Sequence, residues 1–229
     1  MLSKHTFRWL YTSDVIKTTD YYAKSLSGKV LPSFEDISEE ADKAEQGCYN
    51  RLASLSDPES FDPGDIVDDA RDAGVAFYIM AKGVRQGIIN LFTAGLYHLF
   101  EQQALRLYRT ELLWSGEENI PGLLTVKEAR QRLLEDYEID IFAFPSWSKL
   151  EELRLVANTV KHADGVSCTQ LKQVRPDLFI HPSQRHYPSP WAADLLNAHP
   201  VLQPLAGEDL YISPDDFTST AWLKRVTLL

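Results

Sequence analysis

The stretch from Asp65 to Leu113 contains no proline, and this uninterrupted run of 49 residues constrains the fold more than any other feature. Apolar side chains recur along it at three- and four-residue spacing, as they do on one side of an α-helix. Glycines interrupt the pattern at four places, and each costs about 1 kcal/mol relative to alanine in a helix. The run predicts either one helix about 73 Å long or two helices joined near Gly83 or Gly87. The glycines themselves predict close helix packing or a bend.

Helical signals also dominate the rest of the chain. Thr125 and Glu128 have the spacing of a capping box, in which each residue satisfies a free backbone N–H at the start of a helix. Ser148 with Glu151 and Ser167 with Gln170 repeat this spacing. Helices are predicted at residues 14–26, 37–55, 125–136, 148–163, 167–175, 191–198 and 217–227.

These elements predict an all-α protein, because no βαβ alternation and no glycine-rich phosphate loop after a strand occurs. We expect a helical bundle built on the long central helix. Residues 1–229 would form a single domain, with an N-terminal helical lobe at 1–60 and a less regular C-terminal extension at 176–229.

Charge and cysteine content narrow the classes of function. The net charge of −10 produces a field that disfavours broad, nonspecific binding to nucleic acid. Cys48 and Cys168 are far apart and form no CxxC motif, which argues against a zinc ribbon or a disulfide framework. No signal peptide begins the sequence, and no apolar run reaches about 18 residues. We therefore expect a cytoplasmic protein without a membrane span, a metal or a cofactor.

Residues 151–163 carry the candidate site. Arg154, Asn158 and His162 fall at positions i, i+4 and i+8, which places them in one polar stripe along a helix. The apolar residues Leu150, Leu153, Val156, Ala157 and Val160 fall on the other side. The stripe fits a ribonuclease-type active site that faces a cleft, and it fits equally well a solvated helix face.

A second polar stripe lies on the long helix, within residues 96–109. It contains His98, Glu101, Gln102 and Arg109. A histidine and a glutamate at i and i+3 can bind a metal only with further ligands, so a structural polar pair between helices is the other interpretation.

The two stretches LYHLFEQQ and LRLVANTVKHADG together resemble the HEPN superfamily (higher eukaryotes and prokaryotes nucleotide-binding) over roughly residues 75–165. Its members are α-helical bundles, often dimeric, and many are metal-independent endoribonucleases of toxin–antitoxin and phage-defence systems. Their motif is an arginine, usually followed by a polar residue such as asparagine, and then a histidine about five positions after the arginine. Asn158 and His162 match this motif, whereas Ala157 occupies the arginine position.

The resemblance implies roles for individual residues. His162 would be the general acid and base, Asn158 would orient it or the phosphate, and Arg154 would supply the missing cation. Lys161, Arg109 and His98 would bind substrate. Two functions follow from it: a metal-independent endoribonuclease acting on RNA as a homodimer, or a noncatalytic HEPN-like subunit that binds protein partners in a bacterial defence or toxin–antitoxin system.

Overall fold

The structure is a computed structural model that describes residues 4–55, 63–111, 113, 116–117, 125–138, 140–145, 147–182 and 210–218. Within these ranges every regular element is helical, which confirms the predicted all-α bundle. The elements are α1 (Lys4–Ser25), a π-helical turn (Leu26–Val30), a 3₁₀ turn (Leu31–Phe34), α2 (Ile37–Leu55), α3 (Pro63–Glu111), α4 (Val126–Tyr137), a 3₁₀ turn (Ile141–Ala143), α5 (Trp147–His162), α6 (Val166–Val174), a 3₁₀ turn (Pro176–Phe179) and α9 (Pro214–Thr218).

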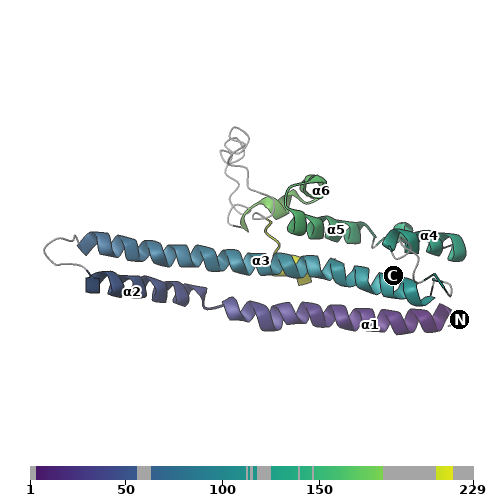
Figure 1. Cartoon of the computed structure of the whole chain (residues 1–229), viewed down its shortest axis with the longest axis horizontal. Coiled ribbons are helices and arrows are strands. Elements are labelled where there is room, and N and C mark those ends of the chain that lie inside the picture. Colours follow the sequence, from purple (N-terminus) through teal and green to yellow (C-terminus); the bar gives the residue numbers. More distant parts are fainter. Residues whose placement is uncertain are drawn as a thin grey trace. The chain divides into compact units, whose positions relative to one another are not determined.

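Residues 65–111 of the proline-free stretch lie in one helix, α3, which has 49 residues and begins at Pro63, so the stretch is one helix and not two (Figure 1). The chain divides into two compact units that share this helix. Residues 25–88, here called the hairpin unit, contain α2 and the first part of α3. Residues 1–24 and 89–229, here called the main unit, contain the rest. The hairpin unit therefore differs from the lobe expected at 1–60, because α2 pairs with the helix that follows it and α1 belongs to the main unit.

The hairpin unit is held by small side chains between α2 and α3. A Cβ atom added to Gly74 would lie 3.0 Å from Glu45 Cβ and 3.2 Å from the carbonyl oxygen of Ala41, so this glycine permits the close approach of the two helices. The buried apolar residues of the unit are few, and half of them are alanines, namely Leu26, Ile37, Ala41, Ile66, Ala70 and Ala81. The packing predicted for Gly74 is thereby confirmed.

In the main unit, α1 packs along the second part of α3. A Cβ atom on Gly95 would lie 2.1 Å from the Tyr22 hydroxyl oxygen, so only glycine fits here. Tyr22 donates a hydrogen bond of 3.1 Å to the carbonyl oxygen of Phe92. The rings of Tyr22, Phe92 and Phe217 lie 5.1 to 6.5 Å apart, which joins α1, α3 and α9 in one aromatic cluster.

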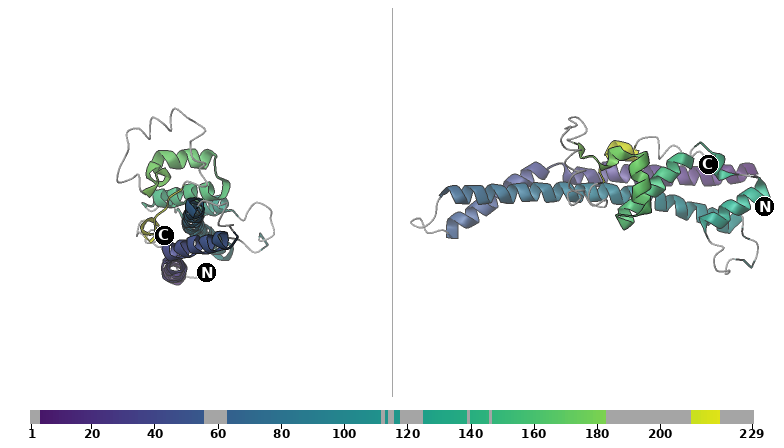
Figure 2. Two further views of the ribbon diagram at one scale, coloured as in Figure 1. Left: turned by 90° about the vertical axis from the view of Figure 1, so that its left-hand side faces the viewer. Right: turned by 90° about the horizontal axis from the view of Figure 1, so that it is seen from above.

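Helix α5 lies along the same part of α3 (Figure 2), and α6 follows it after a short turn. Buried Phe100 of α3 and Leu150 of α5 form a core cluster, and Val15 of α1 packs against it. Nearer the end of α3, fully buried Tyr108 packs against Ala129 of α4. The Thr125 hydroxyl accepts the backbone N–H of Glu128 at 3.2 Å, which confirms half of the predicted capping box.

The segment 210–218 is anchored in the main unit. Leu210, Ile212 and Phe217 are at most 1% exposed. The Asn90 side-chain amide donates to the carbonyl oxygen of Leu210 at 2.8 Å, and the Tyr211 backbone N–H donates to that of Leu178 at 2.7 Å. Residues 210–213, before α9, belong to no regular element. The helix expected at 191–198 and the end of the one expected at 217–227 lie outside the described residues.

Two boundaries differ from the sequence-based expectation. The first helix starts at Lys4, and the chain continues through Gly28 in a π-helical turn, because Gly28 keeps a helical backbone instead of the left-handed one that stops a helix.

Among the described residues, no helix is long and apolar enough to cross a membrane.

Candidate functional site

Helix α5 places the candidate catalytic residues, and its buried surface is wider than a single stripe. Leu150, Leu153, Val156 and Ala157 are buried as expected, whereas Val160 is half-buried. Leu155, Glu152 and Thr159 are buried as well, and the Thr159 hydroxyl donates to the Leu155 carbonyl oxygen at 2.8 Å. The arginine position of the motif, Ala157, therefore faces the protein interior.

The two ends of α5 differ from the capping pattern read in the sequence. The helix begins at Trp147, and the Ser148 hydroxyl donates to the carbonyl oxygen of Pro145 at 3.4 Å. At the other end Ala163 takes the left-handed conformation with φ of 54°, and its N–H bonds the Thr159 carbonyl oxygen at 2.9 Å. Gly165, two residues further on, is extended with φ of 167°.

Arg154 forms an ion pair with Glu151 of the same helix. Its Nε lies 2.9 Å from both carboxylate oxygens of Glu151, and its Nη2 also donates to this carboxylate. Both side chains remain about one-third to two-fifths exposed. These hydrogen bonds raise the pKa of the Arg154 guanidinium, and its positive charge is paired with the Glu151 carboxylate.

The neighbours of Arg154 on α3 are Tyr97 and Glu101. Burial, followed by the charge of Glu101, raises the pKa of the Tyr97 hydroxyl, which also hydrogen-bonds this carboxylate. Arg154 interacts electrostatically with both residues. The surroundings of this arginine thus contain two carboxylates, Glu101 and Glu151, and favour cations over phosphate.

The other predicted site residues of α5, namely the catalytic candidates Asn158 and His162 and the substrate-binding candidate Lys161, lie at its C-terminal end. His162 and Lys161 are exposed, and Asn158 is half-buried one turn earlier. Their spacing on one helix places Asn158 and His162 on the same face, whereas Lys161 points about 100° away from His162.

The predicted substrate-binding residues on α3 are also exposed. His98 has 68% of its side chain accessible and lies 3.8 Å from Glu101, a pair that solvent weakens. Arg109 is exposed near the end of the helix. Among the described residues, no hydrogen bond or ion pair joins His98 or Arg109 to α5. The residues of α3 that interact with Arg154 of α5 are Tyr97 and Glu101.

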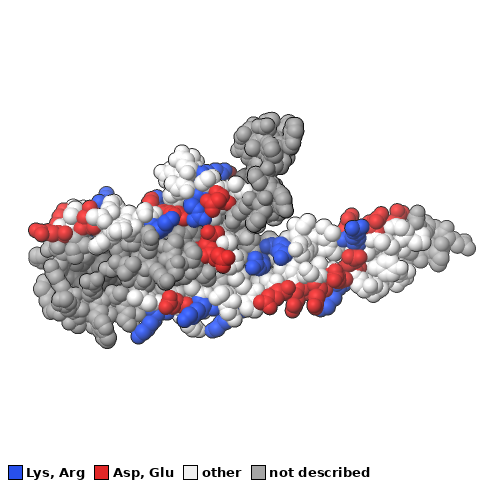
Figure 3. Space-filling model, turned by 180° about the vertical axis from the view of Figure 1, so that it is seen from behind, with Lys and Arg blue, Asp and Glu red and all other residues white. Residues whose placement is uncertain are grey.

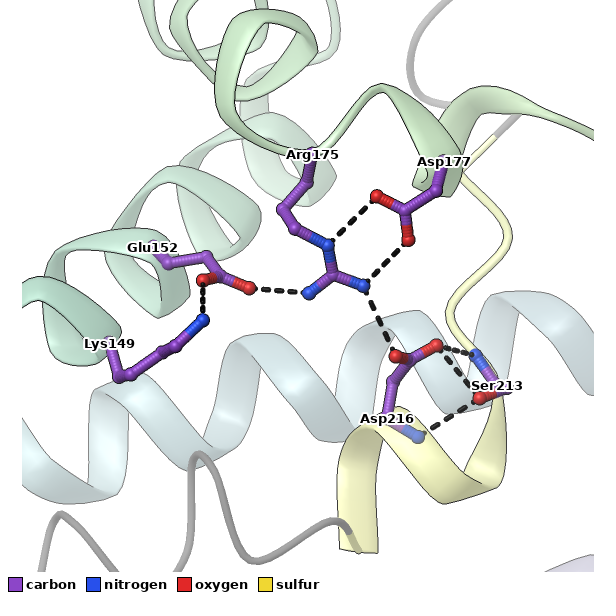
Figure 4. Close-up of polar contacts among 6 residues, drawn as sticks. All are labelled: Lys149, Glu152, Arg175, Asp177, Ser213 and Asp216. Carbon is purple, nitrogen blue, oxygen red and sulfur yellow. Dashed lines mark hydrogen bonds and ion pairs between the residues drawn. The ribbon is translucent and has the colours of Figure 1, made fainter.

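The most extensive polar cluster was not predicted from the sequence (Figure 4). It is built around Glu152, the residue of α5 that follows Glu151. Glu152 is 8% exposed and accepts hydrogen bonds from Lys149 at 2.7 Å and from Arg175 at 2.5 Å. Arg175 also binds both oxygens of Asp177, at 2.9 and 2.8 Å, and one oxygen of Asp216 at 3.1 Å. We call these five residues the Arg175 cluster.

The Arg175 cluster joins segments far apart in the sequence. Asp216 belongs to α9 and closes a capping box there, because it accepts the Ser213 backbone N–H at 3.1 Å and returns its own N–H to the Ser213 hydroxyl at 2.9 Å. The bonds to Asp177 and Glu152 hold the pKa of the Arg175 guanidinium well above its usual value. The Ser213–Asp216 pattern was visible in the sequence, but nothing near Arg175 indicated its three carboxylate partners.

Metal binding finds no support among the described residues, which contain no group of three or more histidine, cysteine, aspartate or glutamate side chains placed to hold an ion. Cys168 is buried, and burial raises the pKa of its thiol, which is the opposite of what a nucleophilic thiolate needs.

Comparisons with known proteins add no family assignment, since no family model, curated protein or solved structure matches this chain. The class that the fold and the site define is an α-helical bundle with a polar face on α5.

Proposed function

We propose that this chain is a noncatalytic, HEPN-like helical subunit that binds protein partners in a bacterial defence or toxin–antitoxin system. The observation that carries the proposal is the pairing of Arg154 with Glu151. Cleavage of RNA at a HEPN-type site needs a cation that stabilises negative charge on the phosphate. Here the arginine position is a buried alanine, Ala157, and the nearest arginine on the polar stripe is neutralised.

The surface charge supports the same proposal. On the face shown in Figure 3, lysine and arginine side chains alternate with aspartate and glutamate instead of forming a continuous basic band. RNA binding relies on such bands, because neutralised phosphates release counterions. Exposed apolar side chains, including Ile79 at 65% and Met80 at 56%, are a feature of surfaces that bind other proteins.

The endoribonuclease function has one specific observation in its favour. His162 is exposed at the end of α5, beside half-buried Asn158, so an RNA strand has access to a general base, whereas exposed Lys161 points about 100° away from it. In this alternative, a dimer partner or a conformational change would have to supply the phosphate-binding charge.

The test is an RNA-cleavage assay on the purified full chain in EDTA, with His162→Ala and Lys161→Ala as variants. We expect no cleavage above the buffer control for any of the three proteins. Cleavage by the wild type that His162→Ala abolishes would overturn the proposal and establish the endoribonuclease. Cleavage that both variants retain would identify a contaminating nuclease, and a repeat after further purification would then decide.

A further inference from the structure

The segment 210–218, drawn in yellow in Figure 1, packs against α1, α3 and the turn after α6, all within the main unit. Leu210, Ile212 and Phe217 are at most 1% exposed, whereas Tyr211, between the first two, is half-buried. Such alternation is typical of a peptide that lies on a protein surface. The segment therefore has the burial pattern of a bound peptide, although it belongs to the same chain.

The surface beneath the segment contacts its main chain. The amide of Asn90, a residue only 5% exposed, donates at 2.8 Å to the carbonyl oxygen of Leu210, which lies 120 positions further along the sequence. The carbonyl oxygen of fully buried Leu178 accepts the backbone N–H of Tyr211 at 2.7 Å. A buried polar group that loses such a partner costs free energy. Because every polypeptide has these main-chain atoms, the two contacts require a polypeptide as occupant without fixing its sequence.

Two side chains of the segment add selectivity. The Phe217 ring lies 6.3 Å from the ring of Tyr22 and 6.5 Å from that of Phe92. The Asp216 carboxylate accepts a hydrogen bond of 3.1 Å from the Arg175 guanidinium. An aromatic ring against two others and a carboxylate on a guanidinium are contacts that only particular residues make. The residues that contact the segment are here called the docking surface, namely Tyr22, Asn90, Phe92, Arg175 and Leu178.

The hydrogen bonds around Arg175 allow the segment to leave without stranding a charge (Figure 4). Arg175 also donates to Glu152 and to both carboxylate oxygens of Asp177, so it keeps these partners when the segment departs. Asp216 keeps its hydrogen bonds with Ser213, which belongs to the segment itself. Each side thus retains its own partners, and neither has to unfold for the other to separate.

We infer that the docking surface is a binding site for a segment of a partner protein, and that residues 210–218 occupy it in the partner's absence. The partner's segment has the chemistry of the one present here: two apolar residues separated by one position, then a serine, and after two further positions a carboxylate followed by an aromatic residue. This inference rests on the proposed function, because it gives the binding of protein partners a place on the chain. Since residues 210–218 are tethered, a partner competes with an effective concentration on the order of millimolar.

The first experiment measures the fluorescence anisotropy of a labelled peptide with the sequence of residues 208–219, titrated with the full chain. Asp215 and Asp216 provide matched substitutions, because Asp215 is exposed whereas Asp216 pairs with Arg175. Asp216→Asn in the chain weakens the docking of its own segment, so this variant should bind the peptide about tenfold more tightly than the wild type does. Asp215→Asn should bind it within about twofold of the wild type. Equal affinities of the wild type and Asp216→Asn, or binding to neither, would overturn the inference.

The same substitutions in the peptide should act in the opposite direction. A peptide with Asp216→Asn lacks the charged contact with Arg175 and should bind the Asp216→Asn chain about tenfold more weakly than the unchanged peptide does. A peptide with Asp215→Asn should bind within about twofold of the unchanged one. Opposite effects of one substitution in chain and peptide indicate competition for one surface, which general destabilisation of the chain does not produce. Equal affinities of the three peptides would overturn the assigned contact.

Hydrogen exchange of the unsubstituted full chain tests release without any variant. The backbone N–H groups of Tyr211 and Phe217 should exchange about 100-fold or more faster than those of Ile89 and Leu96 in α3, and with little dependence on urea. Saturating peptide should accelerate the exchange of the segment further, because it keeps residues 210–218 off the docking surface. Exchange of the segment and α3 at one rate with one urea dependence would show that the segment leaves only on global unfolding, and would overturn the inference.

Failure of this inference is distinguishable from failure of the proposed function. A chain that neither binds the peptide nor cleaves RNA would overturn the inference alone, whereas a chain that binds the peptide and cleaves RNA in the His162-dependent manner would overturn only the noncatalytic function. Sedimentation of the full chain with and without peptide identifies the occupant. A dimer that the peptide converts to a monomer would show that a second copy supplies the segment, and would overturn the proposed partner.

Discussion

Arg175 and Asp216 lie 41 residues apart in the sequence, and Arg175 Nη2 approaches Asp216 Oδ1 to 3.1 Å. The same guanidinium binds Glu152 of α5 and Asp177. One side chain therefore connects α5, the turn after α6 and α9. The three carboxylates and two cations of the Arg175 cluster are partly buried. Removal of a charged partner from such a partly buried network is therefore expected to destabilise the fold.

Arg175→Ala should lower the free energy of unfolding by about 3 kcal/mol, because the guanidinium that joins Glu152, Asp177 and Asp216 would be lost from a partly buried ion-pair network. Urea denaturation followed by circular dichroism measures this change. Lys149→Ala is the control: Lys149 is 35% exposed and pairs with Glu152, so its loss should cost less than about 1 kcal/mol. Equal costs for the two variants would contradict the central role of Arg175.

Glu151 and Glu152 are adjacent on α5 and hold very different ion pairs. Glu151 pairs with Arg154 at the surface, and its replacement by alanine should cost less than about 1 kcal/mol. Glu152 is 9% exposed at its side chain, and the same replacement should cost about 3 kcal/mol. Parallel urea titrations of the two variants measure both costs. A larger cost for Glu151→Ala than for Glu152→Ala would contradict the assignment of the stronger ion pair to Glu152.

Gly95→Ala should be destabilising by about 1 to 3 kcal/mol, because its Cβ atom would overlap the Tyr22 hydroxyl. Gly47→Ala, on exposed α2 with no atom within 4 Å, should instead stabilise by up to about 1 kcal/mol. Thermal unfolding of both variants measures the contrast. Adding Tyr22→Phe to Gly95→Ala should recover part of the loss, and no recovery would show that the hydroxyl is not the obstacle.

The stability of the protein should fall above pH 10. Burial and the Glu101 carboxylate raise the pKa of Tyr97 in the folded chain, while the unfolded residue titrates near 10. As pH rises, Tyr97 therefore loses its hydroxyl proton in the unfolded state before it does so in the folded state. The contribution of Tyr97 to the free energy of unfolding is fully present below pH 10 and is lost as pH rises further. Tyr97→Phe should reduce this loss of stability by at most about 1.4 kcal/mol per pH unit. The measured reduction should be smaller, because solvent screens the charges at this half-buried site.

Urea titrations of wild type and Tyr97→Phe between pH 8 and 11 provide the measurement. Tyr22 and Tyr108 also have pKa values raised by burial, so the wild-type decline should exceed the part that Tyr97→Phe removes. Identical pH profiles for the two proteins would show that Tyr97 ionises as freely in the folded chain as in the unfolded one.

Local patterns in the sequence determined the helices. The proline-free run predicted one helix or two where the structure has α3, and the predicted bounds of α2, residues 37–55, coincide with the observed helix. Thr125 was identified as a helix cap because capping depends on residues only three positions apart. Boundaries were less accurate where the backbone is unusual: the turn at Gly28 is π-helical, and Ala163 rather than Gly165 is left-handed.

The sequence by itself determined that the chain is helical, that α5 has a buried side, and that Arg154, Asn158 and His162 share the other, because helical periodicity is a local property. Only the tertiary structure decided which polar groups meet. Contact between Arg175 and Asp216, or between Gly95 and Tyr22, depends on how helices distant in the sequence pack, and one sequence contains no measure of that distance. The structure likewise separated two packed glycines on α3 from two that face open space.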